Sequence, residues 1–286
     1  MIKNNTLDII KKHNLRLTKS LGQNFLNDEN IVKKIVDAAD LDKDTLVVEI
    51  GPGIGSMTRE LAQRSAGVAA IEIDKHLIPA LHDNLSEYTN IDIINNDVMK
   101  ADITAIISEH MVKYNAKSVK VVANLPYYIT TPIIMRFLEE VSGVDAMVFM
   151  VQKEVAQRMV SGPGTKDYGA LSVAVQFYCK PQILFDVPPH CFIPQPEVHS
   201  TIIRLDILKE PSVKVDDKEL YFKIVKASFG QRRKTLVNSL SNAGFLKKDK
   251  EQLKRILEDM GLKENVRGEV LSVQQFGELS NLLIQH

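Results

Sequence analysis

The sequence has no tryptophan, only two cysteines and no net charge. Cys179 and Cys191 are too few for a disulfide framework, and neither they nor the seven histidines show a metal-binding spacing. No apolar run is long enough to cross a bilayer, and the lysine-rich N-terminus lacks the apolar stretch of a signal peptide. These absences disfavour a disulfide-rich, metal-stabilised or membrane-spanning protein. They predict a cytoplasmic protein that needs no metal.

The remaining composition is that of a globular protein, with 286 residues of which 44% are hydrophobic and 25% are charged. A chain of this length can bury a substantial core in one domain or two. Although the charges balance overall, segments 1–27 and 223–236 each carry five lysines or arginines, against one acid and none respectively. Such patches attract phosphates, but solvated helix faces often carry the same pattern.

The clearest local pattern lies at residues 46–55, LVVEIGPGIG. An apolar run stops at three closely spaced glycines, and residues 56–64 then show helical spacing. This predicts a buried strand, a tight turn and the start of a helix. Glycines allow a backbone to approach a ligand closely and to adopt positive φ angles. The turn fits a nucleotide-type site, and taken alone it also fits an ordinary strand–helix connection.

The next predicted strand ends at Glu72, which lies 21 residues after Gly51. Nucleotide-binding α/β folds place a carboxylate at about this distance, where it accepts both ribose hydroxyls. The alternative is that Glu72 and Asp74 only mark a solvated strand end. With the glycine turn upstream, a bound adenosine moiety is the working hypothesis.

Strand and helix patterns alternate from residue 45 to residue 152. The predicted strands are 46–50, 68–73, 91–95, 119–123 and 146–151, and the predicted helices are 56–65, 75–86, 101–113 and 131–141. Unalternating apolar strands between helices predict a parallel sheet covered on both faces. Ligands of such sheets bind beyond the carboxyl ends of the strands, which directs attention to residues 96–97 and 124–127.

The tetrapeptide Asn124-Leu125-Pro126-Tyr127 follows one of these strands. Proline favours an extended Leu125, so that its carbonyl and the Asn124 side-chain oxygen form two converging acceptors. Two acceptors suit the exocyclic amine of a planar base, and they would direct the nitrogen lone pair at an electrophile. Tyr127 offers a face for stacking. The alternative is a turn in which proline and tyrosine only pack.

Other segments carry weaker expectations. Residues 21–28 are expected to form a loop that exposes Phe25 and Leu26, with Asp28 capping the following helix. The glycine-rich loop 161–169 is expected at the rim of the active site. Phe192, held between prolines, is either a second stacking face or part of the core. The polar linker 209–217 predicts a domain boundary, which gives domains 1–210 and 211–286, the second helical.

Several motifs together resemble the ribosomal RNA adenine dimethyltransferase family, and most closely its bacterial small-subunit (16S) members. These motifs, in chain order, are LGQNFLND, VVEIGPGIGSMTREL, AIEIDKHLIP, NNDVMKAD, VVANLPYYITTPI, FIPQPEVHSTIIRL and FGQRRKTLVNSL. The resemblance implies an α/β fold: a Rossmann-like S-adenosylmethionine-dependent methyltransferase domain, followed by a small all-helical domain that binds RNA or the ribosome.

The resemblance also implies cofactor-binding positions, with S-adenosylmethionine as the methyl donor and no metal. Asn24 and Leu26 would lie over the cofactor, Gly51 would lie at its methionine part, and Gly53 is a further cofactor-binding position. Two acidic residues and one amide complete the implied set. Glu72 would take the ribose hydroxyls, Asp97 the adenine amine, and Asn124 would sit between donor and acceptor.

The implied catalytic residues are Asn124, Leu125, Pro126 and Tyr127, with Phe192 as a second stacking partner. The implied reaction dimethylates two adjacent adenosines in the 3′-terminal hairpin loop of 16S rRNA. The partner would be an immature 30S subunit, and the protein is expected to be a monomer.

Two alternatives remain on the same fold: a 23S rRNA dimethyltransferase that confers macrolide resistance, and a non-catalytic ribosome-assembly or transcription factor. An NAD-linked oxidoreductase would fit the glycine turn and Glu72 but would leave residues 124–127 without a role, and this alternative is rejected.

Overall fold

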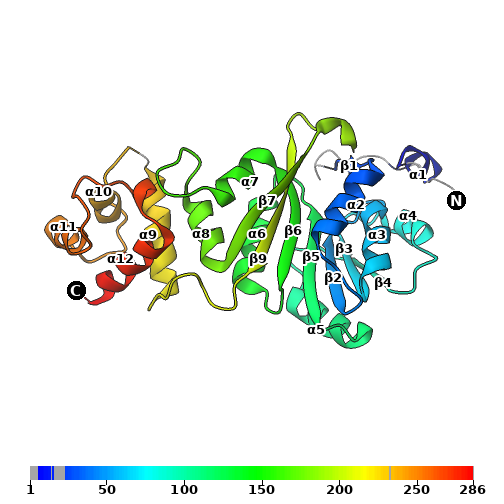
Figure 1. Ribbon diagram of the computed structural model, residues 1–286, viewed down its shortest axis with the longest axis horizontal. Coiled ribbons are helices and arrows are strands. Elements are labelled where there is room, and N and C mark those ends of the chain that lie inside the picture. Colours follow the sequence, from blue (N-terminus) through cyan, green and yellow to red (C-terminus); the bar gives the residue numbers. More distant parts are fainter. Residues whose placement is uncertain (1–5, 14, 16–22, 232, 286) are drawn as a thin grey trace. The chain divides into compact units, whose positions relative to one another are not determined.

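The computed structural model describes residues 6–13, 15, 23–231 and 233–285 and divides into two compact units (Figure 1). We call Met1–Ala156 with Gln182–Ile207 the sheet unit, and Gln157–Pro181 with Leu208–His286 the helical unit. Within the described residues, no helix is both long and apolar enough to cross a membrane.

A seven-stranded sheet with the order β4-β3-β2-β5-β6-β9-β7 forms the centre of the sheet unit. Its strands are β2 (Thr45–Ile50), β3 (Gly67–Glu72), β4 (Ile91–Asn95), β5 (Ser118–Asn124), β6 (Ala146–Gln152), β7 (Cys179–Val187) and β9 (Ser200–Ile207). The pairs β3–β4, β2–β3, β2–β5 and β5–β6 are parallel, which confirms the predicted sheet, and β9 joins β6 antiparallel. The order reverses at β2, so the strand ends next to it border a crevice that suits a ligand.

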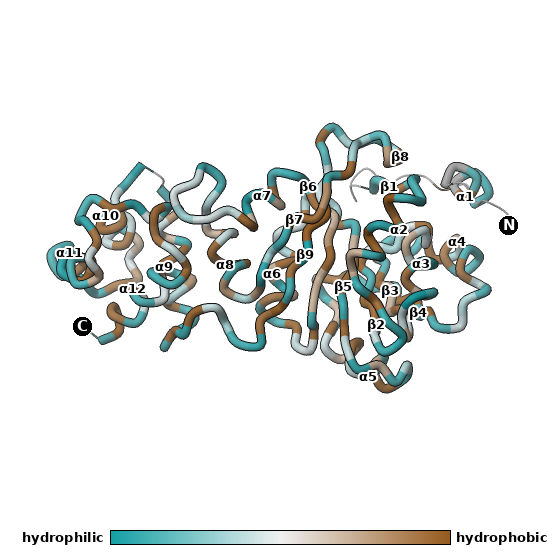
Figure 2. The backbone as a smooth tube through the Cα atoms, viewed as in Figure 1, coloured by the Kyte–Doolittle hydropathy of each residue, from teal (hydrophilic) through white to brown (hydrophobic). Residues whose placement is uncertain are grey.

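Helices cover both faces of this sheet, since every residue of β2 and β3 is buried. They are α2 (Glu29–Ala38), α3 (Ser56–Arg64), α4 (Ile78–Asn84), α5 (Ile103–Tyr114) and α6 (Thr130–Glu140), with the short α1 (Thr6–Lys12) before them and α7 (Lys153–Val160) after β6. As predicted, Asp28 caps α2, because its side chain accepts bonds from the N–H groups of Asn30 and Ile31. In Figure 2 the central strands are largely coloured hydrophobic and the connecting loops hydrophilic.

The prediction that Phe25 and Leu26 are exposed in a loop is wrong. These two residues form strand β1 (Phe25–Leu26), which pairs antiparallel with β8 (Phe192–Ile193), and both side chains are buried. A short 3₁₀ turn, η2 (Pro189–Cys191), precedes β8. The pairing partner lies far along the chain, so the local pattern at residues 21–28 could not reveal it.

The helical unit contains α8 (Ala170–Tyr178), α9 (Lys218–Gly230), α10 (Leu236–Ser241), α11 (Lys250–Asp259), the 3₁₀ turn η3 (Gly268–Val270) and α12 (Val273–Gln285). The unit resumes at Leu208, close to the expected boundary at 210/211, but it also takes in residues 157–181. The reason is that Phe177 of α8 packs in one apolar cluster with Tyr221 of α9 and Phe276 of α12. The loop 161–169 therefore belongs to this unit, and its expected place at the active-site rim stays a prediction.

The close contact between Gly67 and Tyr114 gives a test of how β3 is held. A Cβ at Gly67 would lie 2.2 Å from Cδ2 of the Tyr114 ring, whose hydroxyl donates to Asp92 Oδ2 at 2.7 Å. The ring cannot move aside without losing that hydrogen bond. We expect Gly67→Ala to lower the free energy of unfolding by about 1–3 kcal/mol in denaturant titration. The control Gly162→Ala, where no atom lies within 4 Å, should be near neutral, and equal stability of both variants would contradict this packing.

Candidate functional site

The glycine turn after β2 has the conformation that its sequence predicts. Gly51, Gly53 and Gly55 have φ angles of 66°, 62° and 85°, and α3 begins directly after them. A Cβ at Gly53 would lie 2.8 Å from Cε1 of the Phe25 ring. Both the backbone angles and the close ring therefore require glycine at this position.

Glu72 ties this turn to the end of β3. Its Oε2 accepts a hydrogen bond from the Gly53 N–H at 3.2 Å, and its Oε1 accepts one from the Asp74 N–H at 2.8 Å. Burial raises the pKa of the Glu72 carboxyl, whereas these two backbone donors oppose the shift. Each oxygen keeps acceptor capacity for a ligand hydroxyl, because a carboxylate oxygen can accept two hydrogen bonds.

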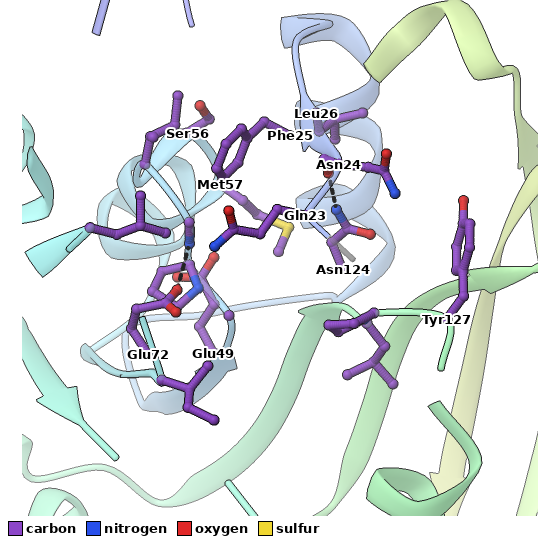
Figure 3. A pocket seen from close by; sticks show the side chains of 18 of the residues that line it. Gln23, Asn24, Phe25, Leu26, Glu49, Ser56, Met57, Glu72, Asn124 and Tyr127 are labelled. Atoms are coloured by element: carbon purple, nitrogen blue, oxygen red, sulfur yellow. Dashed lines mark hydrogen bonds between the residues drawn. The ribbon is translucent and has the colours of Figure 1, made fainter. Parts of the chain in front are cut away.

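Asn124 ends β5 with its side-chain amide held in one orientation. Its Nδ2 donates to the backbone oxygen of Asn24 at 2.9 Å (Figure 3). The amide oxygen is thereby left as an acceptor, and in Figure 3 it points to the side on which Tyr127 lies. The next residue is also fixed, since the Leu125 N–H donates to the Met150 oxygen at 3.1 Å.

The rest of the segment Asn124–Tyr127, which we call the NLPY motif, is anchored to its surroundings. The Pro126 oxygen accepts bonds from the Ile129 N–H at 3.2 Å and the Thr130 hydroxyl at 3.0 Å. The Tyr127 hydroxyl lies 2.7 Å from the hydroxyl of Ser200. Burial raises the pKa of Tyr127, so this side chain is neutral near pH 7.

One pocket joins the glycine turn, Glu72 and the NLPY motif. Its space, including the part open to solvent, is about 910 Å³. It brings together nine of the residues expected in the site: Asn24, Leu26, Gly51, Gly53, Glu72, Asn124, Leu125, Pro126 and Tyr127.

Two expected site residues do not line the pocket. Asp97 lies just beyond β4, where its Oδ1 accepts a bond from the Met99 N–H at 2.9 Å and forms a local turn. Phe192 is only 1% exposed, because its ring packs in the apolar core beside Leu26 and Cys191. The expected stacking face is therefore not presented in this structure, and the alternative of core packing holds.

Gln23 and Phe25 also line the pocket, although neither was predicted as a site residue. Gln23 Nε2 donates to Asp74 Oδ2 at 2.9 Å, while Phe25 lies against Gly53. Residues 23–26, which we call the N-terminal strap, thus line the pocket opposite the strand ends (Figure 3). The motif LGQNFLND was the available signal. Tyr128 was also missed as a site residue: it lines the pocket and is 60% exposed.

Glu49 is a third missed residue, hidden inside the apolar run of β2. It lines the pocket, is fully buried, and neither carboxyl oxygen has a hydrogen-bond partner among the described residues. Burial raises the pKa of Glu49 to about 8; the charge of Glu72 adds to this shift, and the neighbouring Thr58 hydroxyl opposes it. The side chain is therefore mostly protonated at pH 7, beside the ionisable Glu72.

The raised pKa of Glu49 predicts how stability depends on pH. A carboxyl whose pKa is higher in the folded than in the unfolded state holds its proton in the folded protein, so its contribution is lost as pH rises from about 4.5 towards 8. Glu49→Gln should match the wild type at pH 4.5 and exceed it at pH 8.5 by up to about 4 kcal/mol. Denaturant titrations at both pH values test this. A stability difference independent of pH would contradict it, and Glu60→Gln serves as the control.

No group of three or more histidine, cysteine, aspartate or glutamate side chains is placed to hold a metal ion in the described part of the chain. The mostly parallel sheet, the glycine turn and the acid at the next strand end define a Rossmann-like α/β protein with a nucleotide-type site. More particularly, the chain belongs to the family described as ribosomal RNA adenine dimethylase, whose model matches residues 14–279.

Relatives in two bacteria are similar to nearly the whole chain. Ribosomal RNA small subunit methyltransferase A of Alkaliphilus metalliredigens is 53% identical over 96% of this chain and 94% of its own length. The protein of that name in Clostridioides difficile is 50% identical over 98% of this chain and 95% of its own. The expected family is therefore confirmed.

Solved structures agree on the fold. A dimethyladenosine transferase from Plasmodium falciparum has a TM-score of 0.73 at 24% identity, covering 89% of this chain and 95% of its own. The 23S rRNA methyltransferase ErmE has a TM-score of 0.69 at 28% identity, covering 92% of this chain and all of its own.

Proposed function

We propose that this protein transfers methyl groups from S-adenosylmethionine to the exocyclic amines of two adjacent adenosines in the 3′-terminal hairpin loop of small-subunit rRNA. The product would be a pair of dimethyladenosines. The observation that carries the proposal is the fixed Asn124 amide, whose oxygen is left as an acceptor beside Tyr127 in the pocket. The names of the bacterial relatives support the substrate.

The pocket suits this cofactor in charge and in shape. S-adenosylmethionine supplies a methyl group on a positively charged sulfonium and also carries an ammonium. The buried carboxylate of Glu72 would favour a cationic ligand in the pocket, and a bound cation would promote ionisation of the neighbouring Glu49. Glu72 has acceptor capacity for the ribose hydroxyls, and the glycine turn leaves room for close approach of a ligand.

The NLPY motif would orient and polarise the adenine amine. An adenine amine is a weak nucleophile because its lone pair is delocalised into the ring. Acceptors at the Asn124 side chain and the Leu125 carbonyl would draw its two hydrogens out of the ring plane and direct the lone pair at the methyl group. Tyr127, anchored by Ser200, would hold the base by stacking. This chemistry needs position more than a covalent nucleophile.

The second candidate is a large-subunit enzyme, which the likeness to ErmE keeps open at 28% identity. Identities of about 50% to proteins named for the small subunit favour the first candidate. A purely non-catalytic factor would have no need for the oriented Asn124 amide.

The helical unit is proposed to contact rRNA within an immature 30S subunit. Lys226 on α9 is exposed, and so are Arg233 and Lys234 in the connection from α9 to α10, while Arg232 lies outside the described residues. Exposed cations of this kind bind phosphates with a strong salt dependence. Asp97 is proposed to take the cofactor's adenine amine, and the protein is proposed to act as a cytoplasmic monomer.

Glu72 provides the first test of the cofactor. In calorimetric titration with S-adenosylhomocysteine, Glu72→Gln should weaken binding by about 1–3 kcal/mol, because charge-assisted bonds to the ribose are lost. Glu60→Gln, a glutamate on α3 that does not line the pocket, should bind like the wild type. If the wild type bound NAD in preference to S-adenosylhomocysteine, the cofactor assignment would be wrong.

Asn124 provides the test of catalysis. Asn124→Ala should lower single-turnover methyl transfer about 100-fold or more while S-adenosylhomocysteine still binds, because the polarising acceptor is gone. The control Asn90→Ala removes a similar asparagine, whose Nδ2 donates to the Ala62 oxygen at 2.8 Å outside the pocket. Unchanged turnover in Asn124→Ala would remove this side chain from the mechanism.

Mass spectrometry of rRNA from cells that lack the protein separates the candidate functions. Loss of paired dimethyladenosines from the small subunit is the expected result. Loss from the large subunit would support the second candidate, and unchanged modification of both RNAs would refute an enzymatic role in either.

A further inference from the structure

Arg136 connects two segments of the proposed site without lining the pocket itself. It lies on α6, the helix that follows the NLPY motif, and its side chain is 15% exposed. Its guanidinium donates to the backbone oxygens of Val98 and, at 2.8 Å, Ala101. Its Nε also donates to the carboxylate of Glu140 at 3.1 Å. All three nitrogens are therefore engaged.

The two backbone oxygens belong to the turn that carries Asp97. In this turn the N–H groups of Lys100 and Ala101 both donate to the Asp97 oxygen, at 2.8 and 2.9 Å, and the Met99 N–H donates to its carboxylate. Residues 97–101 thus form one compact turn that begins at Asp97. From α6, Arg136 binds the backbone oxygens of Val98 and Ala101 in this turn.

Hydrogen bonding also attaches the start of α6 to the NLPY motif. The Thr130 hydroxyl at the start of α6 donates to the Pro126 oxygen of the NLPY motif at 3.0 Å, and Thr130 is buried. A continuous path of hydrogen bonds and helix therefore joins Pro126 through α6 and Arg136 to the Asp97 turn. Removing the guanidinium would leave the carbonyls of two buried residues, Val98 and Ala101, without these donors, a loss that favours rearrangement of the turn.

We propose that Arg136 is a positioning residue that sets the place of Asp97 relative to the NLPY motif, and thereby the recognition of the cofactor's adenine ring. This inference rests on the proposed function, because it takes Asp97 as the partner of the adenine amine. Arg136 acts through the backbone of residues 98–101 and does not line the pocket.

The test uses full-length Arg136→Met and Arg136→Lys. Calorimetry measures the Kd of S-adenosylhomocysteine and of an analogue in which hydrogen replaces the adenine amine. In Arg136→Met the Kd of S-adenosylhomocysteine should rise about tenfold, and the preference for it over the analogue should shrink. Arg136→Lys, which can still donate to one carbonyl, should fall between the methionine variant and the wild type. If Arg136→Met does not fold, the Kd values of Arg136→Lys provide the test.

The matched control is Arg204→Met. Arg204 makes the same kinds of bond, from Nη1 to the Ala38 oxygen at 3.0 Å and from Nε to Asp206 at 2.8 Å, at a similar exposure, and none of these residues lines the pocket. For Arg204→Met, the Kd of S-adenosylhomocysteine and the preference for it over the analogue should equal those of the wild type. A purely structural role for Arg136 would lower the folded fraction but leave both quantities unchanged in the folded protein, which would overturn the proposal.

Binding of S-adenosylhomocysteine by the wild type shows whether a negative result refutes the role of Arg136 or the proposed function. Wild-type protein that binds S-adenosylhomocysteine while a folded Arg136 variant binds it equally refutes only the role of Arg136. Wild-type protein that binds no S-adenosylhomocysteine refutes the cofactor assignment and this inference with it.

Discussion

The hydrogen bond from the Asn124 amide to the Asn24 oxygen is the contact on which the site depends. It connects the end of β5 to the N-terminal strap, two segments that are a hundred residues apart in the chain. It also fixes which end of the amide faces the pocket, because the nitrogen is used by the strap and the oxygen is left. Without the strap, the glycine turn and Glu72 would line an open crevice, and the amide could turn either way.

The sheet makes this contact possible by aligning the carboxyl ends of β2, β3 and β5. Parallel pairing places the glycine turn, Glu72 and Asn124 along one edge, and the pairing of β1 with β8 brings the strap over it. The backbone at the edge is held by its own side chains, as when Glu72 accepts from the Gly53 N–H. Because the residues that line the pocket are already ordered, ligand binding loses little free energy in ordering them.

The parts of the fold that depend on local pattern were predictable from the sequence. Strands β2 to β6 and the helices between them follow from apolar runs and glycine turns, and the spacing of Glu72 from Gly51 located one wall of the pocket. Features that need a distant partner were not predictable: the β1–β8 pair, the burial of Phe192, and the packing of α8 with α9. Glu49 was not predicted as a site residue, because the sequence does not reveal that its carboxyl has no hydrogen-bond partner among the residues that the structure describes.

The proposed activity of this pocket is methylation of adenine amines in small-subunit rRNA. The most direct measurement incubates purified protein with S-adenosylmethionine carrying a labelled methyl group and with unmethylated small-subunit particles, and then identifies the modified nucleosides by mass spectrometry. We expect labelled dimethyladenosine at two adjacent positions near the 3′ end of the RNA. Label on any other base or atom, or no label in RNA while the protein binds the cofactor, would contradict it.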